Sequence, residues 1–235
     1  MRVTRVDALR LAAAEPRQGR PSAARTRLRA EARDLAHAEG LVDAAYCYCI
    51  VPLEAPPAEL LRAGGERLSA PWLLPASGQL TAIACAACTL GPALERRVSA
   101  LFAERRASLA LALDQLGNEL LFAVSRQAQD RIQADLDRRG LSMAGELRAG
   151  DPGLAIEAQG AVLRLAQAEA IGIRVNAAHL MHPVKSTSMV LGVGIDLPVA
   201  TWSRCDTCPN RNRCAVPARA QAQAVQAADS VSHVE

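Results

Sequence analysis

The sequence predicts a domain that mixes α-helices with β-strands around an apolar core. Hydrophobic residues make up 50% of the 235 residues and charged residues 22%, a balance typical of globular domains. Short runs rich in aromatic, β-branched or cysteine residues are separated by longer segments in which leucine recurs at helical spacing. Collagen-like and disordered chains and mini-proteins are therefore excluded.

The first 41 residues predict an Arg/Ala-rich helical extension. Ala, Leu and Arg recur at helical spacing, and Pro16, Gly19 and Pro21 interrupt the pattern, which suits two polar helices joined by a turn. We place the main domain at residues 42–200, a cysteine-rich metal-binding segment at 201–216 and a flexible tail at 217–235. The tail is rich in Ala and Gln, so we expect it to be frayed or weakly helical.

The first half of the main domain predicts two strands and several helices. Residues 44–52 (AAYCYCIVP) favour a strand, and the two prolines that open 56–68 favour a short helix that a double glycine ends or kinks. Residues 80–91 (LTAIACAACTLG) predict a second strand, which leads into a helix beginning near Pro92. Leucine spacing over 107–139 predicts one long helix or two.

The second half predicts a loop, a helix and two strands. Residues 141–153 hold two turns without periodicity, and a loop before a helix is a place where ligand can bind. Residues 154–170 have the spacing of an amphipathic helix. Residues 171–175 and 188–195 look like strands joined by the loop 176–187.

Composition and motifs argue against several classes of protein. No apolar run reaches the roughly eighteen residues that cross a bilayer, and the N-terminus lacks the apolar region of a signal peptide. We therefore expect a cytoplasmic protein without a membrane partner. Basic residues gather in residues 1–40, but aromatics are only 3% of the chain, which argues against nucleic acid as a partner. Lys185 is the single lysine among 27 basic residues.

The strongest local signal is the C-x2-C-x5-C motif of Cys205, Cys208 and Cys214. Three thiolates within ten residues can converge on one metal centre, and the proline after the second cysteine interrupts regular structure. The spacing resembles the auxiliary iron-sulfur modules of radical-SAM maturases, although Ala218 stands where their fourth cysteine is expected. We expect an iron-sulfur cluster, of the [4Fe-4S] type. The alternatives are zinc in a structural clip and reduced thiols without metal.

The fourth ligand must then come from elsewhere in the chain or from a small molecule. Candidates are the other cysteines and two histidines: Cys47, Cys49, Cys85, Cys88, His179 and His182. Within an extended strand, residues three apart face opposite sides, so Cys85 and Cys88 cannot chelate together and are interpreted as core residues. Cys47 and Cys49 share a face, but burial in the strand is also the favoured interpretation for them.

A second signal is the run MHPVKSTSMVLGVG at residues 181–194. It resembles the M-x-P-x-x-S-x-S run of the S-adenosylmethionine-binding activation domain of cobalamin-dependent methionine synthase. It is still more similar to small stand-alone relatives of that domain, where the run reads M-x-P-x-K-S-x-S before a Gly-rich strand. The matching residues are Met181, Pro183, Lys185, Ser186 and Ser188.

The run RAGDPG resembles that domain's Arg-then-Pro-Gly-Tyr loop through Arg148, Pro152 and Gly153. The spacing is one residue longer here, and Leu154 stands in place of the tyrosine. Two further stretches resemble the stand-alone relatives, with matches at Thr89, Gly91, Asp114 and Gly117. The likeness covers roughly residues 42–215.

The resemblance implies an α+β fold in which helices surround a twisted, largely antiparallel sheet. It also implies that Arg148, Pro152, Gly153, Lys185, Ser186 and Ser188 hold S-adenosylmethionine or contact the corrin of a partner. From the residues alone, Ser186 and Ser188 alternate with Thr187 and so point to one face of a strand, where two hydroxyls could bind an amide or a carboxylate. The alternatives are a solvated loop with a ladder of hydroxyls at the end of the strand for Lys185 and the serines, and a surface charge for Arg148. For Asp114 the alternative is an N-terminal hydrogen bond or a hydrogen bond between elements.

Two functional hypotheses follow. The first is a corrinoid-linked accessory protein for the reductive reactivation of a cobalamin-dependent methyltransferase, with the iron-sulfur cluster as electron carrier and cobalamin provided by the partner. The second is a non-catalytic subunit, stabilised by iron-sulfur or zinc, that docks on a corrinoid-binding protein or another redox assembly.

Overall fold

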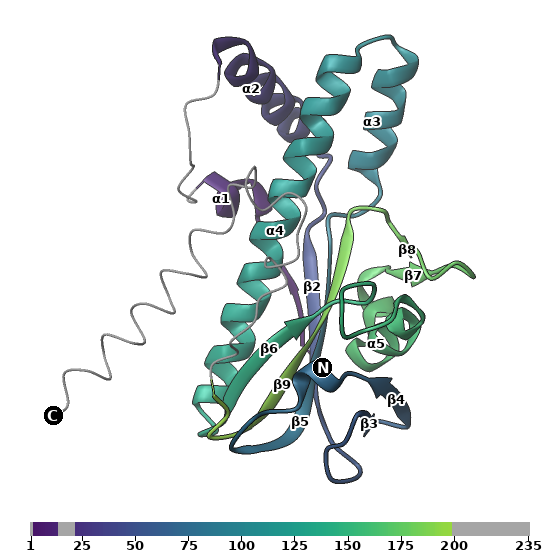
Figure 1. Cartoon of the computed structure of the whole chain (residues 1–235). Helices are drawn as coiled ribbons and strands as arrows, with labels where there is room; N and C mark the ends of the chain where they lie inside the picture. Colours follow the sequence, from purple (N-terminus) through teal and green to yellow (C-terminus); the bar gives the residue numbers. More distant parts are fainter. Residues whose placement is uncertain (1, 14–21, 199–235) are drawn as a thin grey trace, which may run out of the picture.

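The computed structural model describes residues 2–13 and 22–198, and its centre is a five-stranded antiparallel sheet in the order β1-β2-β5-β9-β6 (Figure 1). Two small hairpins, β3–β4 and β7–β8, lie outside this sheet. The strands are β1 Arg2–Arg5, β2 Ala45–Pro52, β3 Leu60–Ala63, β4 Glu66–Ser69, β5 Gln79–Thr89, β6 Ser142–Leu147, β7 Arg174–Val175, β8 Met181–His182 and β9 Ser186–Ile195. The helices are α1 Ala8–Ala13, α2 Ala23–Ala38, α3 Ala93–Ala103, α4 Ala107–Asp137 and α5 Gln159–Ala166, with 3-10 turns at Pro71–Leu73, Ile156–Ala158 and Ala168–Ile171. The expected α+β fold is confirmed.

The central strand β5 divides the core in two because its side chains alternate between the faces of the sheet. Ala84, Ala86 and Cys88 belong to the core on the α4 side. Cys85 and Ala87 belong to the core on the α5 side. Both faces are buried, and this explains why β5 is apolar over nearly its whole length.

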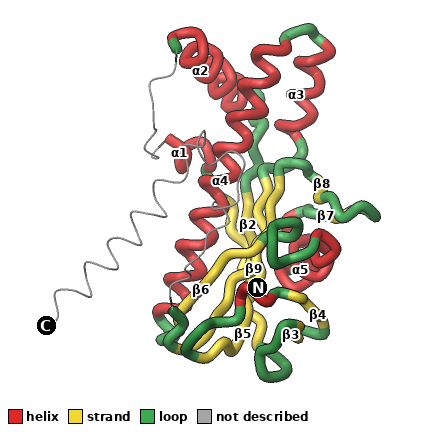
Figure 2. Tube along the Cα trace, viewed as in Figure 1, coloured by secondary structure: helices red, strands yellow, loops and turns green. Residues whose placement is uncertain are grey.

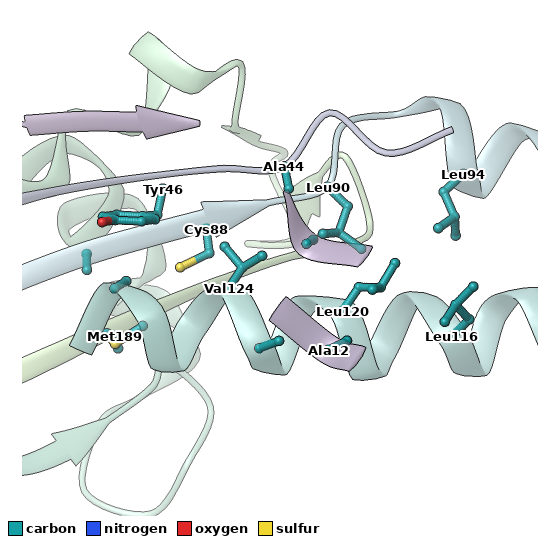
Figure 3. Packing of buried hydrophobic residues seen from close by; sticks show 14 of the residues in the cluster. Ala12, Ala44, Tyr46, Cys88, Leu90, Leu94, Leu116, Leu120, Val124 and Met189 are labelled. Atoms are coloured by element: carbon teal, nitrogen blue, oxygen red, sulfur yellow. The ribbon is translucent and has the colours of Figure 1, made fainter. Parts of the chain in front are cut away.

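The long helix α4 forms one layer of the molecule. Its buried face packs on the sheet, and α1, α2 and α3 contact α4 at other points along its length. Figure 3 shows Leu116, Leu120 and Val124 of α4 directed toward side chains such as Leu90, Leu94 and Cys88. By length and composition α4 could also cross a membrane, but its packing is that of a core helix.

On the opposite face, α5 and the β3–β4 hairpin cover the sheet (Figure 2). Leu61 and Leu68 of the hairpin lie in the same apolar cluster as Val162 of α5 and Ile83 of the sheet. The sheet is therefore covered on both faces, and its edge strand β6 leads directly into the loop that the resemblance assigns to ligand.

The N-terminal segment contains the two expected helices, α1 and α2, and in addition a strand that the sequence analysis did not expect. Residues 2–5 form β1, which pairs with β2 and completes one edge of the sheet. The described helices of this segment are also integrated in the fold, because Ala8, Ala12, Ala32 and Ala36 are buried in the α4-side core. Small side chains on the inner faces of α1 and α2 allow this close approach. Residues 2–5 form a strand because they pair with β2, which lies about forty residues later in the sequence.

Other sequence predictions are confirmed in part. The strands at 44–52, 80–91 and 188–195 and a single long helix within 107–139 are present. The short helix expected in 56–68 is wrong, because this segment forms the β3–β4 hairpin. Its double glycine supplies the turn, with φ angles of +57° at Gly64 and +76° at Gly65, a backbone conformation that suits hairpin turns.

The region after Gly140 differs most from the expectation. Residues 142–147 form strand β6 where a loop was expected. The helix expected over 154–170 is split into α5 and two 3-10 turns, and the strand expected over 171–175 keeps only its last two residues, β7. The segments 201–216 and 217–235 lie outside the described residues.

Candidate functional site

Lys185 immediately precedes β9 and connects the beginning of this strand to α4. Its Nζ donates a hydrogen bond of 2.7 Å to Asn118 Oδ1 and forms an ion pair of 2.7 Å with Asp114 Oδ1. Gly117 lies between these two residues, and a Cβ added there would be 3.2 Å from Lys185 Cε. Only 7% of Lys185 is exposed, so a solvated loop is the wrong description. The alternative interpretation of Asp114, a contact between elements, is confirmed.

The loop before Lys185 is held by helix α3. Glu95 Oε2 accepts a hydrogen bond of 2.5 Å from the backbone N–H of Val184, and Glu95 Oε1 lies 3.5 Å from His182 Nδ1. His182 is exposed and His179 is half-buried in this loop. Both candidate histidine ligands therefore lie near the surface, on the segment that enters β9.

Ser186 and Ser188 are both buried and hydrogen-bonded within the protein. Ser186 Oγ donates to Thr89 Oγ1 at 2.9 Å, and Ser188 Oγ accepts from Gln159 Nε2 of α5 at 2.8 Å. The same Thr89 oxygen accepts the backbone N–H of Gly91 at 3.1 Å. These two serines thus join β9 to β5 and to α5, and any ligand that used them would replace these bonds.

Arg148 follows β6 and reaches the α4 side of the sheet. Its Nη1 donates to Thr187 Oγ1 at 2.8 Å and its Nη2 to Ser125 Oγ at 3.1 Å. Its Nε donates to Glu146 Oε1 at 2.8 Å, while Nη2 lies 2.6 Å from the same oxygen. The side chain is 14% exposed, so it is no simple surface charge. A carboxylate already occupies this guanidinium in the folded chain.

The loop from Arg148 to Leu154 is a compact turn. The backbone N–H of Asp151 donates to the carbonyl of Arg148, and that of Gly150 donates to the carbonyl of Leu154, both at 2.9 Å. Gly153 has φ +89°, a conformation that favours glycine. Leu154 is 1% exposed and belongs to the α5-side core. The residue that replaces the expected tyrosine therefore packs inward.

The predicted binding residues thus lie along one strand and the loop beside it. Arg148 contacts Thr187, which stands between Ser186 and Ser188 on β9, and Pro152 and Gly153 lie in the loop that begins at Arg148. Lys185 immediately precedes the same strand but contacts another part of α4. The structure places Arg148 and Thr187 on the α4 side of the sheet, whereas Ser188 binds α5 on the opposite side, and each polar side chain has an internal partner. Their role in ligand binding stays a prediction.

The metal ligands predicted at Cys205, Cys208 and Cys214 lie outside the described residues. Within residues 2–13 and 22–198, no group of three or more His, Cys, Asp or Glu side chains is arranged to hold a metal. Among the candidate fourth ligands, Cys47, Cys85 and Cys88 are fully buried, as interpreted from the strand pattern, and Cys49 is half-buried. Burial raises the pKa of Cys47 and of Cys88 to about 12 and raises that of Cys85 further. Buried neutral thiols are poor metal ligands, so Cys49, His179 and His182 are the better candidates.

Comparison with known proteins supports the fold. The crystal structure of the MetH reactivation domain bound to AdoHcy matches with a TM-score of 0.64, over 86% of this chain and 80% of that chain, at 13% sequence identity. The chain has the fold of that reactivation domain. No family model and no curated protein matches the sequence. At this identity the likeness with the reactivation domain concerns the fold.

Several residues of the site were missed from the sequence. Glu146 and Ser125 hold Arg148, Asn118 binds Lys185, and Gln159 binds Ser188. Asn118 could have been found, because it stands four residues after Asp114 and so shares its helix face. Glu146 also had a local signal, because it stands two residues before Arg148 and so shares its face of an extended chain. Ser125 and Gln159 come from elements distant in sequence, and no local pattern connects them with their partners.

Proposed function

We propose that this chain is a corrinoid-linked accessory protein that supports the reductive reactivation of a cobalamin-dependent methyltransferase. The observation that carries the proposal is its fold, which is that of a reactivation domain solved with AdoHcy bound. The Arg148 loop and residues 185–188 support it, because they resemble motifs of that domain and Arg148 binds Thr187 between the two serines. In this proposal, the corrinoid is held by a partner, a corrinoid-binding protein or methyltransferase subunit.

S-adenosylmethionine is the proposed ligand of the Arg148 loop, and it would supply an electrophilic methyl group. Arg148 would bind its carboxylate bidentately, the geometry that a guanidinium offers best. Glu146 now occupies the guanidinium, so binding requires Glu146 to give way. The hydroxyls of Ser125 and Thr187 would hold the guanidinium between α4 and β9 during this exchange.

The binding test compares matched arginines by calorimetry. Arg148→Ala should weaken S-adenosylmethionine binding by roughly tenfold or more, because a charge-assisted pair contributes about 1.5 to 3 kcal/mol. Arg164→Ala is the control, since Arg164 forms a similar pair with Glu66, at 2.6 and 3.0 Å, on other elements. Glu146→Gln should strengthen binding by removing the competing charge. The proposed site would be contradicted if both arginine variants lost the same affinity for S-adenosylmethionine, or if the native protein gave no heat of binding at millimolar ligand.

The electron carrier of the proposal is an iron-sulfur cluster on Cys205, Cys208 and Cys214. Such clusters cover potentials low enough for this chemistry. Anaerobically purified protein should be brown and contain iron and acid-labile sulfide, and Cys208→Ser should remove the visible absorption. Cys49→Ser tests whether the half-buried cysteine is the fourth ligand, and Cys88→Ser is the control because Cys88 is buried. Stoichiometric zinc without sulfide would refute the electron carrier.

A second function is a non-catalytic subunit that docks on a corrinoid protein or another redox assembly. Two observations favour it. The Arg148 guanidinium already has hydrogen-bond partners within the protein. Leu154, which stands in place of the expected tyrosine, packs inward. Binding of a corrinoid protein that is unchanged by S-adenosylmethionine and by Arg148→Ala would support this second function over the first.

A further inference from the structure

Three of the four described cysteines lie on one face of the sheet. Cys47 and Cys49 stand two residues apart on β2, so their side chains point to the same side. Cys49 is directly opposite Cys85 of the antiparallel neighbour β5. Cys47 and Cys85 belong to the α5-side core, whereas Cys88 belongs to the core on the other face. All four are free thiols, so the α5 side of the sheet holds three unmodified thiols on adjacent strands.

The strand register places Cys49 and Cys85 at a separation that a disulfide can span. Directly opposed residues of an antiparallel pair have Cα atoms about 4.5 to 5.5 Å apart, and disulfides join Cα atoms about 4.4 to 6.8 Å apart. Cys47 is opposite Ala87 instead, and its distance along the strand to Cys49, about 6 to 7 Å, is close to the upper limit. Burial raises the pKa of Cys85, and the nearby Cys49 thiol raises it further. Cys49 and Cys85 are therefore the favoured pair.

The two thiols of this pair differ in their access to solvent. Strand β1 pairs with β2 only over residues 45–48, so from Cys49 onward β2 has β5 as its one strand neighbour in the described part of the sheet. Cys49 is half-buried, whereas Cys85 is completely buried. A dissolved oxidant therefore reaches Cys49 first, and the buried Cys85 thiol is the neighbour that can react with the oxidised sulfur. An accessible thiol beside a second cysteine is typical of redox-sensing pairs.

We propose that Cys49 and Cys85 form a reversible disulfide between β2 and β5 when the protein meets a hydroperoxide. The Cys49 sulfur attacks one peroxide oxygen, the O–O bond breaks, and the thiol proton leaves with the other oxygen as water or an alcohol. The Cys85 sulfur then attacks the resulting sulfenic acid, the S–O bond breaks, and the hydroxide leaves with the Cys85 proton as water. Two thiols are oxidised and the peroxide is reduced by two electrons. This modification site is independent of the proposed function.

Oxidation of the full chain tests the pairing. Replacing Cys205, Cys208 and Cys214 by Ser leaves four of the seven cysteines, those of the sheet. Stoichiometric hydrogen peroxide should lower the number of thiols titrated after denaturation from four to two, and dithiothreitol should restore it. Trypsin cleaves between the two strands, so mass spectrometry without reductant should show the peptides 34–62 and 68–96 joined by a bond that reductant breaks. The same linked peptides should appear when the native chain is oxidised.

Single substitutions identify the pair, because each of these peptides contains two cysteines. Cys49→Ala and Cys85→Ala should abolish the link, whereas the matched controls Cys47→Ala and Cys88→Ala should keep it, with circular dichroism confirming that each variant is folded. In Cys85→Ala, dimedone should label Cys49, because its sulfenic acid then has no opposed thiol to react with. A link that survives in Cys49→Ala or Cys85→Ala, or four thiols that persist after peroxide treatment, would overturn the proposal. Either result leaves the test of S-adenosylmethionine binding unaffected.

Discussion

Replacing Lys185 by Met separates a structural role for the only lysine from a role in ligand binding. Met keeps an unbranched side chain of similar length, so the apolar stem beside Gly117 and Leu94 is preserved. The substitution removes the ammonium that joins β9 to Asp114 and Asn118 of α4. Loss of a contact between a strand and the longest helix should lower the free energy of unfolding.

The expected loss is about 2 kcal/mol. The hydrogen bond from the ammonium to Asn118 is worth about 1.5 to 3 kcal/mol when charge-assisted, and Asn118 is only partly buried, which favours the lower end. The ion pair with Asp114 adds less than about 1 kcal/mol, because the Asp114 side chain is 43% exposed and screened by solvent. For a chain of this size the midpoint of thermal unfolding should fall by about 4 to 8 °C.

Urea unfolding followed by circular dichroism measures this change. The midpoint should fall while the slope m stays constant, because the exposed surface is unchanged. Asp114→Asn should cost less than about 1 kcal/mol, and the pair Lys185→Met with Asn118→Ala should be non-additive in a double-mutant cycle. A Lys185→Met protein within about 0.5 kcal/mol of the native one would refute the structural role. If that variant also lost S-adenosylmethionine, Lys185 would be a ligand-binding residue as the resemblance implies.

Three further outcomes follow from the buried side chains. Leu154→Tyr should destabilise the protein by about 1 to 3 kcal/mol and not improve ligand binding, because the site is filled core, whereas Leu154→Met should stay near native in urea unfolding. Cys49 should react with iodoacetamide before Cys47 and Cys88, as peptide mapping of the described segment would reveal; equal rates would contradict the burial. The raised pKa of Cys88, about 12 against an ordinary 9.0, makes the folded state hold a proton that the unfolded state releases above pH 9. The contribution of Cys88 to stability should therefore be constant below about pH 9 and fall up to about pH 12, and Cys88→Ala should reduce the loss of stability in that range by up to about 1.4 kcal/mol per pH unit.

The sequence by itself determined the elements whose pattern is local. The apolar run of β5 predicts a strand buried on both faces, and the strand period correctly separates Cys85 from Cys88. Leucine spacing predicts α4, and Pro92 marks the start of α3, where it is the cap residue. These predictions succeed because side-chain period and proline geometry act within a few residues.

Tertiary structure decided the elements and contacts that depend on distant partners. Strand β6 has no clear period of its own and exists because it pairs with β9, and β1 exists because it pairs with β2. The double glycine was a local signal for the hairpin at Leu60–Ser69, but the preceding prolines favoured the prediction of a helix. At the site, the motifs drew attention to Arg148 and Lys185, but Ser125 and Asn118 became their partners only through the packing of α4 on the sheet. A buried charge requires a partner in space, and the fold brings that partner from wherever in the chain it lies.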